Sequence, residues 1–482
     1  MNYSIIRRTL GFLLLFEAIF FLLPLITAVI YWEAAFFAFL ISIAVCALVG
    51  GALIWKKPKD SSIYTKEAFV IVALGWIVMS LFGALPFCLS GEIPSYVDAL
   101  FETVSGFTTT GATIMNSGAE VEALPKSILM WRSFTHWIGG MGVLVFIMAF
   151  LPLSGAKNLQ IMKAESPGPE VSKFVPKIRQ TAKILYLIYT ALTLTQLVLM
   201  VIGGMPFFDA ITTAFGTAGT GGFAVKGDSM AGYSVFLQVV ITVFMLLFSV
   251  NFNSYYLLGR RKWKEALNTE VKVFFIIVFS AIALITANLC FVNQYSFLEA
   301  LQHVAFTVSS IISTTGFATE DFNLWPAFSK SILVLLMFIG ACAGSTGGGM
   351  KVSRCIMLSK GAAHEVKRIL HPKQVKKITM DKRVVEHEVV RSLNAYVIAY
   401  ILIFVVSLLF ISLEGYDMVT NFTSVAATIN NVGPGLGLVG PTGSFAFFSV
   451  PSKIVFIFDM LVGRLEVFPM LILFAPSTWR KS

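Results

Sequence analysis

Charged residues are scarce in this chain, and their scarcity argues against a soluble globular protein. Asp, Glu, Lys and Arg make up 13% of the 482 residues, whereas soluble domains carry about 25%. Hydrophobic residues make up 57%, the mean hydropathy is +0.81, and apolar runs of about 20 residues, long enough to cross a bilayer, recur from end to end. The sequence predicts an all-α polytopic membrane protein whose first apolar run, 10–30, is a retained helix rather than a signal peptide.

Cysteine pairs and the common enzyme motifs are also missing. The five cysteines form no CxxC pair and no ligand cluster with the five histidines, which argues against a disulfide framework or a structural zinc site. No serine-hydrolase elbow and no zinc-protease motif occurs. The segment 344–351 resembles a phosphate-binding loop, but Met350 separates its last glycine from Lys351 and no strand precedes it. We therefore expect no enzyme activity and no bound organic cofactor.

The net charge of +10 is distributed among loops instead of forming one patch. Basic residues follow alternate apolar runs, at Lys56, Lys57, Lys59, Lys157, Lys163, Lys173, Lys177, Arg179, Lys183, Arg260, Arg261, Lys262, Lys264 and throughout 351–391. The other loops carry acids, at Glu92, Asp98, Glu120, Glu122, Asp228, Glu320, Asp321, Glu414 and Asp417. Because positive loops stay in the cytoplasm, this pattern predicts that both termini are cytoplasmic and that the charge reflects topology, with no nucleic acid partner.

Four similar units follow a predicted N-terminal helix hairpin at 9–30 and 34–55. Each unit consists of an apolar helix, a short half-apolar segment, a Gly/Thr loop and a second apolar helix. The first helices are expected near 68–90, 182–203, 271–292 and 392–413, and the second near 126–150, 234–258, 328–358 and 450–474. Such repetition indicates one unit copied four times. It divides the chain into a hairpin at 1–60 and pore units at 61–160, 161–265, 266–385 and 386–482.

The four loops have the composition of an ion-coordinating backbone, reading TTTG at 108–111, TGGF at 220–223, TTGF at 314–317 and NNVG at 430–433. Glycine allows backbone angles that turn consecutive carbonyls toward one axis, and such rings replace the hydration shell of K⁺ in channel filters. The segment before each loop has an acid near its start and is too short to span the membrane. We expect four re-entrant helices whose negative ends point at a cation, in a pseudo-fourfold arrangement around one pore.

Longer motifs around these loops resemble the TrkH/KtrB superfamily of potassium transporters (Trk/Ktr/HKT), and most of all its TrkH/TrkG branch. The motifs are SGFTTTGAT at 105–113, WIGGMG at 137–142, STTGFAT at 313–319, GSTGGGMK at 344–351 and NVGPG at 431–435. The resemblance covers essentially the whole chain. The N-terminal hairpin distinguishes the Trk branch from the shorter Ktr branch.

The resemblance implies that K⁺ is the transported ion and that the filter glycines are Gly111, Gly222, Gly316 and Gly433. The carbonyls that line the ion would belong to Thr109, Thr110, Thr220, Gly221, Thr314, Thr315, Asn431 and Val432. One glycine per loop indicates a shorter ring than that of a channel filter, so some passage of Rb⁺ or Na⁺ is expected. The fourth loop departs most from the pattern, because Asn430 and Asn431 replace threonines.

The resemblance also implies partners and a location. It predicts a homodimer in the bacterial cytoplasmic membrane, docked to a cytosolic, nucleotide-binding TrkA-type regulator. Basic residues that could receive the regulator, or could serve only as a positive-inside loop, are Lys367, Arg368, Lys373, Lys376 and Lys377.

A glycine-rich interruption is the first candidate for a gate below the filter. Five glycines fall within 340–349 in an otherwise apolar run, and each costs about 0.5–1 kcal/mol relative to alanine inside a helix. They predict a helix break that lines the pore, and close helix packing by small residues is the alternative. The resemblance makes the break a movable intramembrane loop, comprising Gly344, Ser345, Thr346, Gly347, Gly348 and Gly349.

Arg464 is the second candidate for a gate. It lies well inside the last apolar run, where a charge costs at least about 2.5–3.5 kcal/mol. We expect it either to face the pore, where the resemblance places it in the permeation path, or to pair with an acid such as Glu466. Lys351 and Arg354, just past the glycine-rich segment, are expected to anchor the membrane interface.

These observations favour potassium uptake through a gated, channel-like pore. A membrane potential of ~100 mV supplies ~2.3 kcal/mol per monovalent cation, which drives uptake without nucleotide chemistry in this chain. A Na⁺- or H⁺-coupled symporter of the same fold is the alternative. A membrane enzyme or a non-transport scaffold would not need four filter-like loops.

Overall fold

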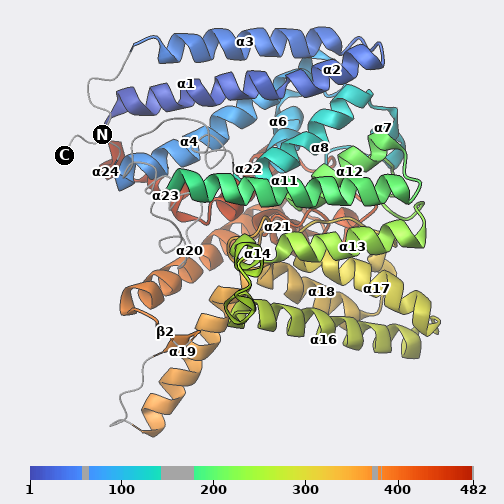
Figure 1. Cartoon of the computed structure of the whole chain (residues 1–482), viewed down its shortest axis with the longest axis vertical. Coiled ribbons are helices and arrows are strands. Elements are labelled where there is room, and N and C mark those ends of the chain that lie inside the picture. The colour runs from blue at the N-terminus through green and yellow to red at the C-terminus, as the bar shows by residue number, and fades with distance from the viewer. Residues whose placement is uncertain (57–63, 143–177, 372–377, 382, 480–482) are drawn as a thin grey trace.

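The computed structural model describes residues 1–56, 64–142, 178–371, 378–381 and 383–479 as a bundle of helices (Figure 1). The N-terminus and the last helix, α24 (Pro476–Trp479), lie at one end of this bundle, from which α19 (Val352–Leu370) also projects. Predicted features outside the described residues are positions 143–150 of one helix and the basic residues Lys57, Lys59, Lys157, Lys163, Lys173, Lys177, Lys373, Lys376 and Lys377.

Among the described residues, six helical segments are long and apolar enough to cross a membrane, and the bent pair Val235–Ser249 and Phe252–Gly259 would be a seventh if it forms one span. The six are α1 (Tyr3–Phe20) with α2 (Leu22–Ile30), α3 (Phe36–Ile54), α4 (Thr65–Gly83) with α5 (Leu85–Leu89), α11 (Ile178–Ile202), α16 (Thr269–Val292) and α20 (His387–Ile411). These segments are the predicted hairpin and the predicted first helix of every unit. The expectation of an all-α polytopic membrane fold is therefore confirmed.

Four short helices follow the first helices: α6 (Tyr96–Phe107), α12 (Phe207–Gly219), α17 (Phe297–Ile312) and α21 (Met418–Ile429). They contain 12 to 16 residues, or about 18–24 Å at 1.5 Å per residue, which is too short for a ~30 Å hydrocarbon layer. The side chains of Ser95, Ser296 and Asp417 cap three of them by accepting a backbone N–H three residues on. The fourth, α12, starts after Pro206, whose fixed φ suits a helix start.

The second helices are shorter than predicted. They are α8 (Lys126–Gly140), α13 (Val235–Ser249), α18 (Ala327–Ile339) and α22 (Val450–Arg464). The continuous helices predicted at 234–258 and 450–474 are wrong, because each breaks and restarts, as α14 (Phe252–Gly259) and α23 (Phe468–Phe474). The run 328–358 also breaks, between α18 and α19, as its glycines predicted. The angle between α13 and α14 is 91°. Only the break in the third unit was expected.

Local chemistry explains the two unexpected breaks. Asn251 caps α14 by accepting the N–H of Asn253 at 2.9 Å, so a new helix starts directly after extended Val250. Pro469 cannot donate to the carbonyl of Leu465 and its ring would clash with that carbonyl, so α22 cannot continue. The chain instead turns through positive φ at Glu466 and Val467.

The short and second helices pack in a cyclic order. Each second helix contacts the short helix of its own unit and that of the next unit: α8 contacts α6 and α12, α13 contacts α12 and α17, α18 contacts α17 and α21, and α22 contacts α21 and α6. The last unit therefore packs on the first.

The N-terminal hairpin packs on the outside of the first unit. Helix α1 lies against α3 and α4, and α2 lies against α8. Glu33, in the hairpin turn, caps α8 by accepting the N–H groups of Lys126 at 2.5 Å and Ser127 at 2.9 Å. The remaining elements are small: α7 (Gly118–Ala123), α15 (Trp263–Ala266), the 3₁₀ turns 322–324, 412–414 and 437–439, and a hairpin of β1 (Thr379–Met380) and β2 (Arg383–Val384).

The cap of α21 gives a prediction about pH. The Asp417 carboxylate, outside the spans, accepts the Thr420 hydroxyl at 2.6 Å and its N–H at 2.9 Å, and these bonds lower the pKa of Asp417. The cap therefore stabilises the fold above the unfolded-state pKa of Asp417 and is lost as pH falls through the lower folded-state value. We expect Asp417→Ala to cost about 1 kcal/mol of stability at neutral pH.

Thermal unfolding in detergent at about pH 7 and about pH 3 checks this prediction. Asp417→Asn is the matched control, because asparagine caps equally well without a titrating charge. Equal losses for the alanine variant at both pH values would contradict the role of the carboxylate.

Candidate functional site

The four Gly/Thr loops share one backbone conformation. A positive φ occurs two residues before each glycine, at Thr109 (56°), Thr220 (57°), Thr314 (60°) and Asn431 (54°). It recurs at the glycines themselves, Gly111 (80°), Gly222 (81°), Gly316 (83°) and Gly433 (95°). The residue between has a φ of ordinary sign, so handedness alternates and successive carbonyls turn to the same side. This register includes the fourth loop, despite its different sequence.

The loops contact one another in a closed ring. A methyl group built on Gly111 would lie 2.0 Å from the carbonyl oxygen of Gly221, and one on Gly222 would lie 1.9 Å from that of Thr315. The corresponding distances are 2.4 Å from Gly316 to Val432 and 2.6 Å from Gly433 to Thr110. In every case the carbonyl belongs to the residue just before the next glycine. The structure thus brings together all the residues predicted from the four loops.

Eight carbonyl groups of these loops, two in each, have no hydrogen-bond donor among the described residues. The oxygens concerned are those of Thr109, Thr110, Thr220, Gly221, Thr314, Thr315, Asn431 and Val432. Buried carbonyls normally have a partner in protein or water. The C-terminal ends of α6, α12, α17 and α21, which carry partial negative charge, lead directly into the loops. The ring therefore offers a cation unpaired oxygens and four favourable helix ends.

The polar side chains of the loops form hydrogen bonds to other protein groups, so they do not compete with the ring carbonyls for a cation. The hydroxyls of Thr108 and Thr110 lie 2.8 Å apart, and those of Ser313 and Thr315 lie 2.6 Å apart. Asn431 donates to the hydroxyl of Thr110 and to the carbonyl of Met460, both at 2.9 Å. The amide that departs from the threonine pattern therefore links the fourth loop to the first.

A buried ion pair braces the first loop, and the sequence analysis missed it. Glu102 on α6 pairs with Arg132 on α8 at 2.6 Å, and both side chains are almost fully buried. Glu102 also accepts the hydroxyl of Thr113 and the N–H of Ile114, both at 3.0 Å. The Arg132 guanidinium lies 4.1 Å from the ring centre of Phe223 in the second loop. The pair therefore connects two neighbouring loops.

His136 connects the same two loops one turn further along α8. Its Nδ1 lies 2.8 Å from the carbonyl oxygen of Gly106, and its Nε2 accepts the N–H of Phe223 at 3.3 Å. These partners fix the tautomer with hydrogen on Nδ1. Arg132 and His136 lie inside an apolar run. Because ionisable residues within a membrane span are usually functional, both could have been predicted from the sequence as candidate site residues.

The glycine-rich segment 340–351 lies directly against the loops. The N–H of Gly348 donates to the Thr314 hydroxyl at 2.6 Å, and that of Gly349 donates to the Asn430 carbonyl at 3.0 Å. On the side of the second unit, the Thr346 hydroxyl donates to the Phe248 carbonyl at 3.1 Å. The predicted helix break therefore exists and bridges three units.

Arg464, the last residue of α22, joins the first unit to the glycine-rich segment. Its guanidinium donates to the carbonyls of Thr346 at 2.8 Å, Gly140 at 2.7 Å and Gly139. Glu466 forms its ion pair with Arg354 instead.

The predicted interface anchors are wrong. Lys351 donates to the carbonyls of Gly347 and Gly348, and the side chain of Arg354 is only 14% exposed. Both cations face inward because the broken helix leaves carbonyl oxygens that need donors.

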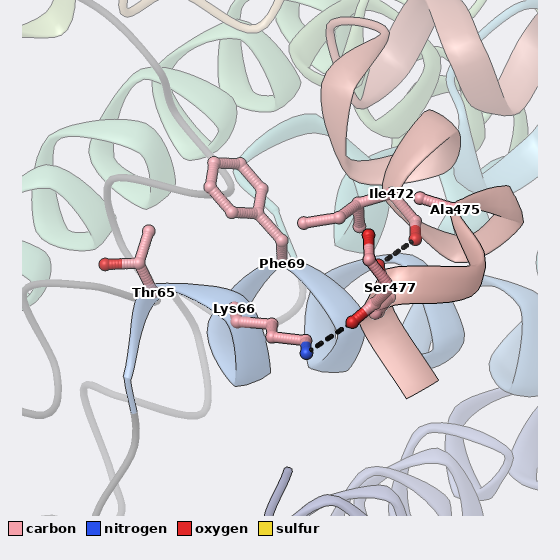
Figure 2. A pocket seen from close by; sticks show the side chains of 7 residues that line it. Thr65, Lys66, Phe69, Ile472, Ala475 and Ser477 are labelled. Carbon is pink, nitrogen blue, oxygen red and sulfur yellow. Dashed lines mark hydrogen bonds between the residues drawn. The ribbon is translucent and has the colours of Figure 1, made fainter. Parts of the chain in front are cut away.

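A surface pocket lies apart from this site (Figure 2). Thr65, Lys66 and Phe69 line it from α4, and Ile472, Ala475, Ser477 and Thr478 line it from the C-terminal segment. Lys66 points across it and donates to the Ser477 carbonyl at 2.8 Å. The contact fixes the end of the chain against α4.

Comparison with known proteins assigns the family. A family model described as TrkH, cation transport protein, matches residues 35–481. The chain belongs to the TrkH family. It is 38% identical to the Trk system potassium uptake protein TrkH of Salmonella typhimurium over 100% of both chains. It is 33% identical to the Trk system potassium uptake protein TrkG of Escherichia coli over 99% of this chain and 98% of the relative.

The fold of the TrkH family is also recovered in a solved structure. The crystal structure of the potassium transporter TrkH from Vibrio parahaemolyticus superposes with a TM-score of 0.89 and 34% identity over 100% of both chains. The predicted resemblance to TrkH/TrkG-type proteins is therefore confirmed.

Gly222→Ala tests the ring contacts in this TrkH-family chain. The added methyl would meet the Thr315 carbonyl at 1.9 Å and force two loops apart, so we expect at least about a tenfold loss of cation uptake into proteoliposomes. Gly204→Ala is the matched control, since its φ is +87° and nothing lies within 4 Å. Wild-type uptake in the Gly222 variant would rule out close packing of the loops.

Glu102→Ala tests the buried brace. Arg132 would remain buried without its carboxylate, so we expect a loss of about 3–5 kcal/mol in stability, seen as a lower thermal midpoint in detergent. Removing both charges, as Glu102→Met with Arg132→Met, should restore most of that loss. A double variant no more stable than the single one would show that the penalty is not electrostatic.

Proposed function

We propose that this chain takes up K⁺ across the bacterial cytoplasmic membrane through a gated, channel-like pore. The names of its relatives, which are potassium uptake proteins and a potassium transporter, support K⁺ as the ion. The observation that carries the mechanism is the closed ring of loop contacts with unpaired carbonyl oxygens. Such oxygens can replace the hydration shell of K⁺ as the ion passes. K⁺ is therefore the transported substrate, and the chain itself acts as a transporter rather than an enzyme.

The proposed filter is the set of twelve residues Thr109, Thr110, Gly111, Thr220, Gly221, Gly222, Thr314, Thr315, Gly316, Asn431, Val432 and Gly433. The cyclic packing of short and second helices supports a pseudo-fourfold arrangement of units 61–160, 161–265, 266–385 and 386–482 around it. One glycine of positive φ per loop makes the ring short, which favours some passage of Rb⁺ and Na⁺.

The driving force in this proposal is the membrane potential. About 100 mV contributes ~2.3 kcal/mol per monovalent cation, equivalent to nearly a fiftyfold concentration ratio. A Na⁺- or H⁺-coupled symporter of the same fold is the second candidate. It differs in requiring a gradient of the coupling ion.

The proposed gate consists of the glycine-rich segment and Arg464. The two are in contact, since Arg464 donates to the carbonyl of Thr346 in the segment and also to that of Gly140 in the first unit. A fixed positive charge beside the path repels K⁺, and its hydrogen bonds hold the segment under the ring. Lys351 adds a second cation to the segment, on the carbonyls of Gly347 and Gly348 next to the Thr346 carbonyl that Arg464 binds. Opening then requires that these donors leave their carbonyl partners.

The proposed assembly is a homodimer with a cytosolic, nucleotide-binding TrkA-type regulator. The Trk system names of the relatives support a cooperating subunit. Exposed Lys367 and Arg368 on α19 offer it a basic surface. The shared end of the N-terminus, α19 and α24 in Figure 1, with the basic loops, supports a cytoplasmic location for both termini.

Ion flux in proteoliposomes tests the proposal. With an inside-negative potential and no Na⁺ or H⁺ gradient, we expect K⁺ uptake above that of protein-free vesicles. Uptake that appears only with a Na⁺ or H⁺ gradient would favour the symporter. No K⁺ flux under any of these conditions, with or without the regulator, would reject transport.

Arg464→Ala tests the gate. Removing the guanidinium removes both the repulsion and three donors to the carbonyls, so we expect basal K⁺ flux to rise by at least about tenfold. Arg260→Ala, at an exposed position after α14, is the control and should leave flux unchanged. Equal flux in the two variants would argue against a barrier at Arg464.

A further inference from the structure

Glu270 holds the glycine-rich segment at two points that flank its loop 344–349. Its Oε1 atom accepts the N–H of Ala343 at 2.7 Å, inside the segment and directly before that loop, and the N–H of Ser353 at 3.0 Å, just after the segment. Glu270 lies in the first turn of α16, and its residue is only 4% exposed. One carboxylate oxygen therefore ties two points ten residues apart in sequence to a third helix.

The chemistry of these bonds makes them strong. Ser353 is the second residue of α19, so its N–H is one of the groups at a helix start that lack an intrahelical partner. A carboxylate is favoured there by the helix dipole and forms hydrogen bonds about twice as strong as a neutral acceptor does. Burial limits the competition from water. Movement of either flank must break a charge-assisted bond.

The start of α16 is itself held by the hairpin of β1 and β2. Asp381, in the turn between β1 and β2, accepts the N–H of Thr269 at 2.8 Å and the Thr269 hydroxyl at 2.6 Å. Thr269 directly precedes Glu270. In the chain, the segment 340–351 is followed by α19 and then by the hairpin of β1 and β2. The contact of Asp381 with Thr269 therefore connects this hairpin back to α16.

We propose that Glu270 is the positioning residue of the gate and that Asp381 links it to the cytoplasmic face. A displacement of the hairpin then moves Thr269 and Glu270, and releases Ala343 and Ser353 together. The two hydrogen bonds of Glu270 reach Ala343 and Ser353, so it acts on the ion path through the segment it holds. The inference rests on the proposed gating function of that segment.

Cys342 supplies a readout that does not depend on ion flux. Its side chain is fully buried beside Ala343, so reaction with a small water-soluble maleimide reports loosening of this flank. The other cysteines, Cys46, Cys88, Cys290 and Cys355, are replaced by alanine, and modification is followed by mass spectrometry of the full-length protein in proteoliposomes.

We expect Glu270→Ala to raise the modification rate of Cys342 by at least about tenfold, since two buried N–H groups lose their acceptor. Glu270→Gln should give a smaller rise, because an amide oxygen is a weaker acceptor. Glu265→Ala, an exposed acid on α15, is the matched control and should match the parent. If the alanine variant is not monodisperse in gel filtration, the glutamine variant carries the comparison.

The outcomes separate the inference from the proposed function. A rate equal to that of Glu265→Ala overturns the role of Glu270, whatever happens to K⁺ flux. Faster modification with unchanged flux supports the role of Glu270 and rejects the segment as a gate. Asp381→Ala should also raise the rate, by about twofold to fivefold, and no rise there overturns the link to the cytoplasmic hairpin.

Discussion

Unpaired backbone carbonyls inside a membrane protein are the constraint on which the rest of this structure depends. Lipid offers no donors, so irregular backbone at that depth must be enclosed by protein or face water. Here four loops with alternating handedness meet, and two carbonyl oxygens of each loop lack donors among the described residues. Only a surrounding shell that supplies every other hydrogen bond can hold such a ring. Thr108, Ser313 and Asn431 belong to that shell.

The same constraint explains the broken second helices. The second helices break after α13, α18 and α22, and a helix end leaves carbonyls without intrahelical partners. Cationic side chains meet these oxygens: Arg464 binds the carbonyls of Gly140 and Thr346, and Lys351 binds that of Gly348. The proposed filter and the proposed gate thus use the same chemistry, in which carbonyl oxygens accept either a mobile cation or a side-chain cation.

The sequence predicted the features that depend on local backbone freedom. Glycine at 111, 222, 316 and 433 marks positions of positive φ, and the run 340–349 breaks its helix. The turns at Asn251 and Glu466 were not predicted, although Pro469 indicates that the helix ends near Glu466. The pairing of Glu102 with Arg132 and of Glu270 with Ala343 could not be predicted, because the partners lie 30 and 73 positions apart in the sequence. The sequence shows that a buried glutamate is costly in free energy, but only the fold shows which residues are its partners.

Ion density is the most direct test of the carbonyl ring. A structure of the protein determined in Rb⁺, with anomalous scattering to identify the ion, should place density among the carbonyl oxygens of Thr110, Gly221, Thr315 and Val432. Density at comparable distances from all four loops is the predicted result. Density bound to side chains elsewhere, with none among these four oxygens at saturating Rb⁺, would contradict it.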